Sequence, residues 1–186
     1  LAAERTALNL MSYLSGIATY THRCVEAIAG TNATIMDTRK TLPGYRDLSK
    51  YAVRCGGGRN HRMRLDDGVM VKDNHIALTG NIAQAIAKAR KLTPALTKIE
   101  VECDTMEQVE AALIAKPDVI MLDNMSVKQV KAAVALVAGR LPLEVSGGMT
   151  LENILAYAET GIEFISLGSL THSVKIIDLG LDITLS

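Results

Sequence analysis

Aromatic residues are scarce in this chain: they make up 3% of its 186 residues, with no Trp and a single Phe. Proteins that bind single-stranded nucleic acid stack the bases on aromatic side chains, so the composition argues against that class. Charge is balanced as well, because 20 Lys and Arg face 20 Asp and Glu. A neutral chain has no summed field to hold a nucleic-acid backbone or an anionic membrane. We therefore expect no nucleic-acid partner and no membrane partner.

Long apolar runs and paired cysteines are also missing. No uncharged apolar stretch reaches the roughly 18 residues that a membrane span requires, so a transmembrane role is excluded. The three cysteines, Cys24, Cys55 and Cys103, are far apart and odd in number. That pattern argues against a disulfide framework and against a cysteine-based zinc site. We expect a cytoplasmic protein.

The spacing of apolar residues predicts a long first helix and then alternating strands and helices. The helix spans residue 4 to about residue 29 and ends at Gly30. Short apolar runs predict strands at residues 33–37, 68–72, 99–103, 119–123, 143–146 and 164–168. Most are followed by helical patterns, at residues 46–55, 81–92, 106–115, 127–138 and 151–159. Capping residues open four of these helices, namely Asn81, Thr105, Ser126 and Thr150.

This alternation predicts an α/β fold with a parallel sheet. A doubly wound sheet usually carries a glycine-rich nucleotide turn after its first strand, and no G-x-G-x-x-G sequence follows an early strand here. Polar residues at the strand ends favour a parallel β/α barrel, incomplete at about six strands. We expect one catalytic domain over residues 1–186, with an entry helix (1–30), the barrel (31–170) and a C-terminal extension (171–186). Residues 179–185 alternate in polarity, which predicts an edge strand outside the barrel.

Positive charge is concentrated at residues 39–64, which hold eight Lys or Arg against one acid, Asp47. Arg46, Lys50 and Arg54 are spaced four apart, which is typical of a solvated helix face. The glycines at 56–58 are predicted to end that helix.

Other cations of this segment lie beside strand ends or glycines, where a ligand can approach. They are Arg39, Lys40, His61 and Arg62, and Lys72 ends the second predicted strand. Arginine matches carboxylates and phosphates with a planar fork, while lysine acts as a point charge. These residues predict a site for a small polyanion.

Acidic and glycine-rich strand ends complete the predicted rim. Glu102 and Asp123 end two buried strands. Because the ends of parallel strands meet, we expect these acids to face the basic residues named above. This arrangement predicts Mg²⁺ bound together with substrate phosphates. The alternative is that each acid pairs with a rim lysine. The turns Ser146-Gly147-Gly148 and Gly168-Ser169 expose backbone N–H groups, which predicts a phosphate cradle.

Several motifs together resemble the quinolinate phosphoribosyltransferase family, whose members are also called carboxylating nicotinate-nucleotide pyrophosphorylases. The resemblance covers essentially the whole chain. It rests on ERTALNLMSYLSGIAT (4–19), DTRKTLPGYR (37–46), YAVRCGGGRNHRMRLDDGVMVKDNHI (51–76), IMLDN (120–124), EVSGGMT (144–150) and ETGIEFISLGSLTHS (159–173). Unrelated barrels have no reason to carry these motifs in this order.

The resemblance implies transfer of a phosphoribosyl group from phosphoribosyl pyrophosphate to quinolinate, with decarboxylation and Mg²⁺, in de novo NAD synthesis. The products are nicotinate mononucleotide, pyrophosphate and CO₂. Carried over by position, the quinolinate residues are Arg39, His61, Arg62 and Lys72. Lys40 then lies near the donor, and Glu102 and Asp123 lie near its ribose and the metal. The phosphate positions are Ser146, Gly147, Gly168 and His172.

One departure from the family concerns the chain's start. Members carry a domain before the ERTALN helix, and here only three residues precede it. The resemblance implies that this domain lends an arginine to the neighbouring subunit of a dimer. We therefore expect the barrel part of the enzyme, a homodimer or higher assembly, and a site that the missing domain completes.

Three other interpretations remain open. One is a related phosphoribosyltransferase that acts on another base, including the molybdenum-associated homologue of the family. A second is an aldolase-like barrel in which Lys72 forms a Schiff base. A third is a non-catalytic fragment that binds dicarboxylates.

Overall fold

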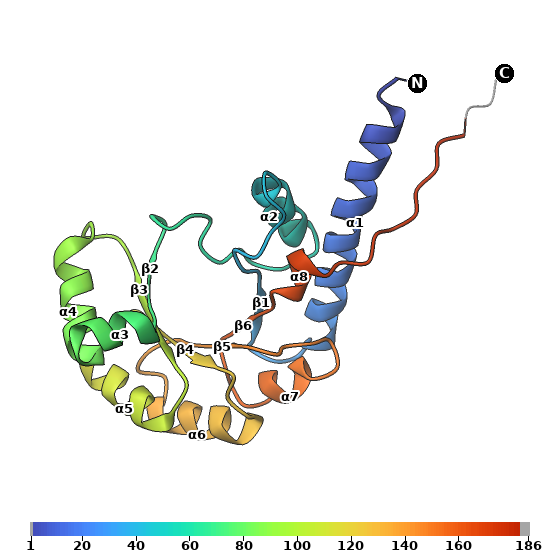
Figure 1. Cartoon of the computed structure of the whole chain (residues 1–186). Helices are drawn as coiled ribbons and strands as arrows, with labels where there is room; N and C mark the ends of the chain where they lie inside the picture. Colours follow the sequence, from blue (N-terminus) through green and yellow to red (C-terminus); the bar gives the residue numbers. More distant parts are fainter. Residues whose placement is uncertain (1, 183–186) are drawn as a thin grey trace.

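A curved parallel sheet with helices along its outer face organises the chain (Figure 1). The computed structural model describes residues 2–182. The six strands pair in the order β1-β6-β5-β4-β3-β2. They are β1 (Thr34–Met36), β2 (Val69–Val71), β3 (Ile99–Cys103), β4 (Val119–Asp123), β5 (Leu143–Ser146) and β6 (Phe164–Ser166). Within residues 2–182, β1 and β2 do not pair with each other, so the predicted incomplete barrel is confirmed.

Eight helices accompany these strands in the described part of the chain. They are α1 (Glu4–Ala27), α2 (Arg46–Cys55), α3 (Asp73–Thr79), α4 (Ile82–Leu92), α5 (Met106–Ala115), α6 (Val127–Val137), α7 (Ile154–Ala158) and α8 (Ser169–His172). The short α3 and α8 were not predicted, because each is about two turns or fewer and shows no amphipathic period. None of these helices combines the length and hydropathy needed to cross a membrane.

The helix caps agree with the sequence except at α7. The side chains of Asn81, Thr105 and Ser126 each accept a backbone N–H three residues later. Thr150 does not cap a helix: its own N–H donates to Asn153 Oδ1 at 2.9 Å, and α7 begins at Ile154.

Thr105 and Gln108 have the spacing of a capping box, but only half of the box forms. The hydroxyl of Thr105 accepts the N–H of Gln108 at 3.3 Å, but the Gln108 side chain accepts from Asp104, one residue before the cap. A complete box forms at α6 instead, between Ser126 and Gln129.

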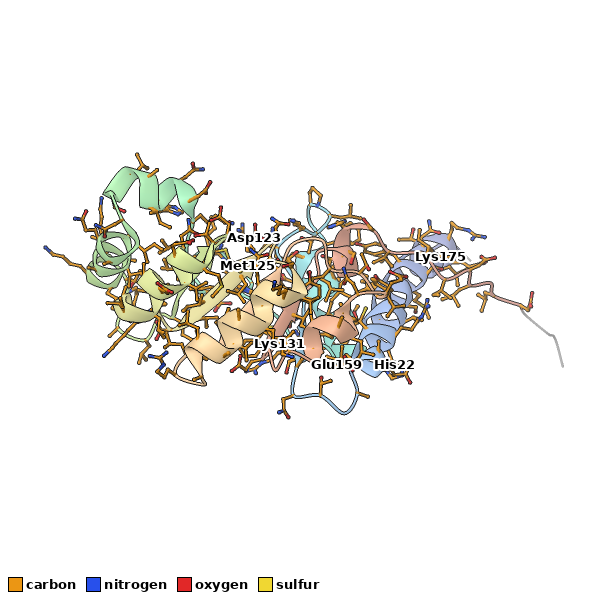
Figure 2. The ribbon with its side chains drawn as sticks, turned by 90° about the horizontal axis from the view of Figure 1, so that it is seen from below. His22, Asp123, Met125, Lys131, Glu159 and Lys175 are labelled. Atoms are coloured by element: carbon orange, nitrogen blue, oxygen red, sulfur yellow. The ribbon has the colours of Figure 1, made fainter. Side chains whose placement is uncertain are left out.

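The core lies between the sheet and the helices and consists of aliphatic side chains. The middle strands are almost fully buried, as near-continuous apolar runs predict for a sheet covered on both faces. Helices α6 and α7 pack next to each other over this region (Figure 2, where Lys131 marks α6 and Glu159 follows α7).

Helices α1 and α2 pack closely at a glycine. A Cβ atom on Gly56 would lie 2.4 Å from the carbonyl oxygen of Ala18 and 2.7 Å from Thr21 Cβ. Gly57 has φ +86°, a conformation that favours glycine, and α2 ends at Cys55. The predicted helix stop is therefore confirmed, and Gly56 also permits the close approach of α1.

After α8 the chain runs beside α1 without regular structure. Ile177 donates its N–H to the carbonyl of Ser12 at 3.2 Å, and Figure 2 shows Lys175 beside α1. The predicted edge strand over 179–185 is wrong for residues 179–182, which form no strand. The rest of that prediction lies outside the described residues.

Candidate functional site

A cavity of about 500 Å³ lies at the carboxyl ends of the strands. We call it the rim cavity. Nine of the eleven predicted site residues line it, namely Arg39, Lys40, His61, Arg62, Lys72, Glu102, Asp123, Ser146 and Gly147. Side chains separated by up to about a hundred residues thus meet because parallel strands end at one edge of the sheet.

Gly168 and His172 are not among the lining residues of the rim cavity. They lie behind Lys40, where a Cβ on Gly168 would be 2.9 Å from His172 Nε2 and 3.2 Å from Lys40 Cδ. The adjacent Thr171 hydroxyl donates to the carbonyl of Lys40 at 2.6 Å. Gly168 and the short helix α8 therefore pack against Lys40.

Two guanidinium groups face the rim cavity with incomplete pairing. Arg39 Nε is buried and has no hydrogen-bond partner among the described residues. Arg62 donates to the carbonyl of Gly68 at 2.8 Å. Burial lowers the pKa of Arg62, and the positive charge of Arg39 lowers it further. Adjacent cations in a partly buried cavity favour an anionic ligand, which would supply the missing acceptors.

The two rim acids have different partners. Glu102 forms an ion pair with Lys72, so the alternative of pairing with a lysine holds for this residue. An ion-paired amine is protonated and a poor nucleophile, which disfavours the Schiff-base interpretation. Asp123 accepts a hydrogen bond from the Asn124 amide at 2.7 Å.

Both acids nevertheless line the same cavity, and a carboxylate that is paired with a lysine can still bind an ion through an oxygen. Carboxylate oxygens are the hard ligands that Mg²⁺ prefers. They form no group of three metal-ligating side chains within residues 2–182. The donor set therefore fits an ion whose remaining ligands are phosphate and water oxygens, and it does not fit an all-protein metal cage.

The turn after β5 requires glycine. Gly147 has φ +89°, and a Cβ there would lie 2.3 Å from Asn124 Oδ1 and 2.8 Å from the Asn124 backbone nitrogen. The missing side chain lets the backbone of β5 and the loop after β4 close together at the cavity wall.

A buried ion pair holds the loop that carries His61 and Arg62. Lys50 and Asp37 are both fully buried and form an ion pair. Asp37 also accepts the Asn60 amide at 2.6 Å and the backbone N–H of His61 at 2.9 Å. Burial raises the pKa of Asp37 and lowers that of Lys50, and their mutual attraction opposes both shifts.

The prediction that Lys50 belongs to a solvated helix face is therefore wrong. Charge spacing alone does not tell which side of an amphipathic helix faces the sheet, and α2 turns Lys50 inward toward Asp37 at the carboxyl end of β1. A useful signal was Asp37, because a carboxylate at a buried strand end needs a partner.

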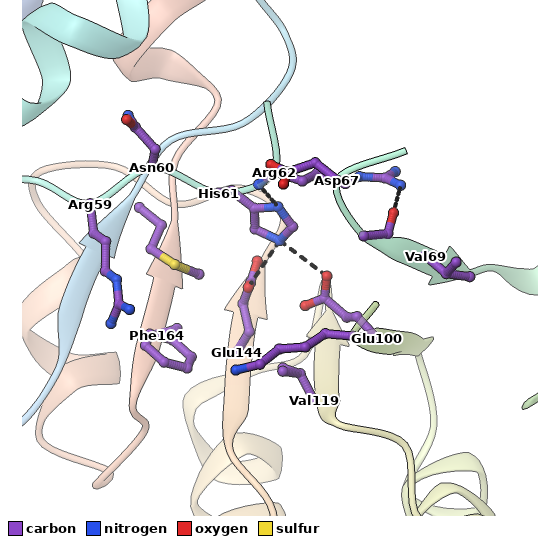
Figure 3. A pocket seen from close by; sticks show the side chains of 13 residues that line it. Arg59, Asn60, His61, Arg62, Asp67, Val69, Glu100, Val119, Glu144 and Phe164 are labelled. Carbon is purple, nitrogen blue, oxygen red and sulfur yellow. Dashed lines mark hydrogen bonds and ion pairs between the residues drawn. The ribbon is translucent and has the colours of Figure 1, made fainter. Parts of the chain in front are cut away.

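Sequence reasoning missed two glutamates inside the barrel. His61 Nε2 lies 3.0 Å from Glu100 Oε2 and 3.3 Å from Glu144 Oε2 (Figure 3). Glu144 is 1% exposed and Glu100 7%. Both interrupt apolar strands, at the second position of IEVEC and of LEVS. The sequence contained a signal for these residues: each is an acidic residue within a largely apolar strand, at a position that faces the barrel interior.

This His61–Glu100–Glu144 cluster retains an extra proton. Burial lowers the pKa of His61, but the two glutamates outweigh it and raise the pKa to about 10. Burial raises the pKa of Glu144 to about 7, and the hydrogen bond from His61 opposes that shift. The His61 imidazole therefore carries its second proton at neutral pH, and the Glu144 carboxyl keeps a proton to higher pH than an ordinary glutamate.

A second cavity, of about 240 Å³, lies on the other side of this cluster. We call it the lower cavity. Its walls include Lys98, Val119 and Phe164, at the amino ends of their strands (Figure 3). His61, Arg62 and Glu144 line both cavities. They therefore form the floor of the rim cavity.

Comparison with known families gives a match over most of the chain. The profile described as "Quinolinate phosphoribosyl transferase, C-terminal domain" matches residues 17–182. Among curated proteins, nicotinate-nucleotide pyrophosphorylase (carboxylating) of Mycobacterium leprae is 51% identical over 186 residues, covering 98% of this chain. A probable enzyme of that name from Bacillus subtilis is 50% identical and covers 100% of this chain. The chain spans 65% and 64% of the lengths of these two relatives.

Solved structures agree with this result. NadC from Streptococcus pyogenes superposes with a TM-score of 0.91 at 46% identity, covering 95% of this chain and 62% of that one. Nicotinate-nucleotide pyrophosphorylase from Ehrlichia chaffeensis gives a TM-score of 0.94 at 46% identity, covering 99% and 67%.

Proposed function

The chain belongs to the quinolinate phosphoribosyltransferase family, and we propose that it transfers the phosphoribosyl group of phosphoribosyl pyrophosphate to quinolinate with loss of CO₂. The products are nicotinate mononucleotide, pyrophosphate and CO₂. The observation that carries the proposal is the pair of guanidinium groups in the rim cavity, Arg39 and Arg62. The Nε of Arg39 is buried and has no hydrogen-bond partner in the part of the chain that the structure describes. Such a pair suits an aromatic diacid, because each fork can receive one carboxylate.

The first chemical step forms a bond between the pyridine nitrogen and C1 of the ribose and breaks the bond to pyrophosphate. Positive charge develops at C1 as the pyrophosphate leaves. Glu102 and Asp123, on β3 and β4, stabilise that charge. Lys40, which follows β1 and lines the same cavity, neutralises the departing oxygens, and Arg39 and Arg62 align the acceptor.

Mg²⁺ is part of the proposal. Glu102 and Asp123 would hold the ion together with phosphate oxygens, and the ion would neutralise negative charge that develops on the leaving pyrophosphate. The Ser146-Gly147 turn, which lines the same cavity, suits the phosphate of the sugar.

Decarboxylation follows from the charge on the ring. Once the nitrogen carries the ribose it is cationic, so the bond to the adjacent carboxylate breaks and its electron pair stays on the ring carbon. That carbon then takes a proton from water. The chemistry requires no covalent enzyme nucleophile, in agreement with an ion-paired Lys72.

The proposal also includes the oligomeric state of the protein and its cellular location. We infer a homodimer or higher assembly in which further parts of the enzyme complete the rim cavity. A cytoplasmic location is supported by three free thiols, Cys24, Cys55 and Cys103.

Calorimetry and a turnover assay test this function. The chain is titrated with quinolinate and with phosphoribosyl pyrophosphate plus Mg²⁺, and CO₂ and nicotinate mononucleotide are measured with both substrates present. Binding of quinolinate and release of both products support the proposal. Turnover of only a monocarboxylic base, or binding of quinolinate without turnover in the complete assembly, would contradict it in favour of the other interpretations.

Two substitutions separate the roles. Arg62→Ala should weaken quinolinate binding tenfold or more, about 1.4 kcal/mol, while donor binding changes far less. Asp123→Asn should lower the chemical rate while quinolinate binding is retained. Equal losses of both ligands in the first variant, or unchanged turnover in the second, would remove that residue from its assigned role.

A further inference from the structure

Asn124, which lines the rim cavity, has an unusual backbone conformation. Three non-glycine residues among residues 2–182 have a positive φ, namely Lys116, Asn124 and Ala138. Lys116 and Ala138 cap the carboxyl ends of α5 and α6, where a left-handed residue commonly ends a helix. Asn124, with φ +54°, lies between β4 and α6, so no helix end explains its conformation. Left-handed backbone of this kind clusters at functional sites.

The side chain of Asn124 lies between two strand ends of the site. Its amide nitrogen Nδ2 donates to Asp123 Oδ2 at 2.7 Å. Its amide oxygen Oδ1 lies at Gly147, where an added Cβ atom would be only 2.3 Å away. An ionised carboxylate accepts hydrogen bonds and cannot donate them, so Asp123 determines which end of the amide faces it. The amide therefore has one orientation, between the acid of β4 and the glycine turn after β5.

The backbone of Asn124 connects the same two strand ends. Its N–H donates to the carbonyl of Ser146 at 3.0 Å, directly after the paired positions Asp123 and Ser146. In a regular strand, successive side chains point to opposite faces of the sheet, so Asn124 would point away from Asp123. The positive φ turns its side chain back toward Asp123 while its N–H remains bonded to β5.

This hydrogen bond restricts the Asp123 carboxylate. The terminal torsion of an aspartate is broad, so a half-buried carboxylate without support rotates among many orientations. A bond to Oδ2 fixes the plane of the group before a ligand arrives. Charge stabilisation in a transition state is strongest when the acceptor is already oriented, because no reorganisation then accompanies the reaction.

A purely structural role explains the residue less well. Glycine adopts a positive φ without the steric penalty of a Cβ atom. A turn that needed only this backbone conformation would be satisfied by glycine, as it is nearby at Gly147 and Gly148. Asn124 instead combines the less favourable backbone with an amide that contacts Asp123.

We propose that Asn124 is a positioning residue for Asp123: its side-chain amide holds the carboxylate in the orientation that receives the ribose of the donor and its metal ion. The left-handed backbone of Asn124 places that amide. This inference rests on the proposed function, and it adds Asn124 to the site residues that the sequence motifs indicate.

Asn124→Gly separates the amide from the backbone conformation. Glycine keeps the positive φ and removes the amide, so we expect the melting temperature to rise or to fall by no more than about 2 °C. Donor affinity, measured by calorimetry with phosphoribosyl pyrophosphate and Mg²⁺, should fall fivefold or more, and turnover should fall tenfold or more. Quinolinate affinity should stay within twofold.

Two further variants complete the experiment. Lys116→Gly is the matched control, because it makes the same change of backbone freedom at the exposed end of α5, and it should change neither affinity nor turnover. In the Asp123→Ala background the amide has no carboxylate to orient, so Asn124→Gly should there change donor affinity less than twofold.

Four results would each overturn the positioning role. They are a loss of donor affinity below fivefold in Asn124→Gly, a comparable loss of quinolinate affinity, a melting temperature lower by more than about 2 °C, and an undiminished effect in the Asp123→Ala background. A wild-type chain that binds the donor but no quinolinate refutes the proposed function, and the donor affinities still decide the role of Asn124.

A measurement without ligand covers the remaining case, a chain that binds neither substrate. Magnetisation transfer from water gives the exchange rates of side-chain amide protons in ¹⁵N-asparagine-labelled protein, and Asn124→Gly identifies the Asn124 signals. The proton bonded to Asp123 should exchange at least fivefold more slowly than those of Asn9, another exposed asparagine. Equal rates would overturn the proposal.

Discussion

Buried charged side chains hold the loops of the site in place. The pair of Lys50 and Asp37 anchors residues 59–62 to β1 through Asn60 and the backbone of His61. Removing one member of a buried pair leaves the other charge without a partner, which costs more than the intact pair contributes. The pair therefore connects local stability to the position of Arg62.

Lys50→Met tests this anchor. We expect the free energy of unfolding to fall by about 3–5 kcal/mol, because Asp37 would remain buried and unpaired. Urea unfolding measures the loss. The control is Lys88→Met on an exposed face of α4, which should change stability by less than about 0.5 kcal/mol. Similar losses in both variants would show that the ion pair has no special role.

The pH dependence of stability reports on Glu144. Burial raises its pKa from 4.5 to about 7, so the folded state binds this proton more tightly than the unfolded state. The resulting stabilisation is fully present below pH 4.5 and is lost as the pH rises through about 7. The free energy of unfolding of the wild type should fall in this window relative to that of Glu144→Gln, by at most about 1.4 kcal/mol per pH unit.

Urea unfolding of both proteins at a series of pH values checks the difference. Titrating groups outside the His61–Glu100–Glu144 cluster are common to both proteins and largely cancel in the comparison. His61 does not cancel, because Glu144 contributes to its raised pKa, and its loss of a proton adds to the fall in the wild type at higher pH. Charged groups of both signs line the two cavities with Glu144. They are His61 and Glu100 in the cluster, Arg39, Lys40, Arg62, Lys72, Glu102 and Asp123 in the rim cavity, and Arg59, Asp67 and Lys98 in the lower cavity. Parallel stability curves would contradict the assignment of the raised pKa.

At the level of helices and strands, the sequence was most informative for the buried middle strands and for two helices that pack on the barrel. The bounds of β3, β4, β5, α2 and α5 agree with the prediction to the residue. Strands β1, β2 and β6 are shorter than predicted, because each is paired over only three positions. A strand extends only as far as its neighbour offers backbone partners, and no local pattern contains that information.

Gly56→Ala tests the contact between α1 and α2. The added methyl group would collide with the backbone of Ala18, and overpacking of this kind typically costs about 1–3 kcal/mol. Scanning calorimetry should show a lower melting temperature. Gly180→Ala is the matched control, since a Cβ there meets nothing within 4 Å among residues 2–182. An equal effect in the control would contradict close packing at Gly56.

The whole molecule is an open barrel with one polar mouth. The order β1-β6-β5-β4-β3-β2 brings the ends of all six strands to one rim, and the floor of His61, Arg62 and Glu144 separates the rim cavity from the lower cavity. The function proposed for the rim depends on this convergence, because no single strand carries more than a small part of the site.

Thiol labelling measures how well the barrel protects its interior. Cys55 is exposed, while Cys24 and Cys103 are buried, and burial raises their pKa to about 11 and about 12. Iodoacetamide should therefore label one thiol in the native protein and three in urea, as counted by mass spectrometry. Rapid labelling of a second thiol under native conditions would show that the barrel opens.

Local patterns in the chain were sufficient to establish the alternation of strands and helices, most caps, the incomplete barrel and the convergence of nine rim residues. These features follow from apolar periodicity and from the rule that parallel strands end together. The inward turn of Lys50, the pairing of Glu102 with Lys72 and the support of His61 by Glu100 and Glu144 emerged only from the folded chain. Each depends on which side chains meet across distant segments, and burial in that setting, more than residue type, decides whether a charge is solvated, paired or protonated.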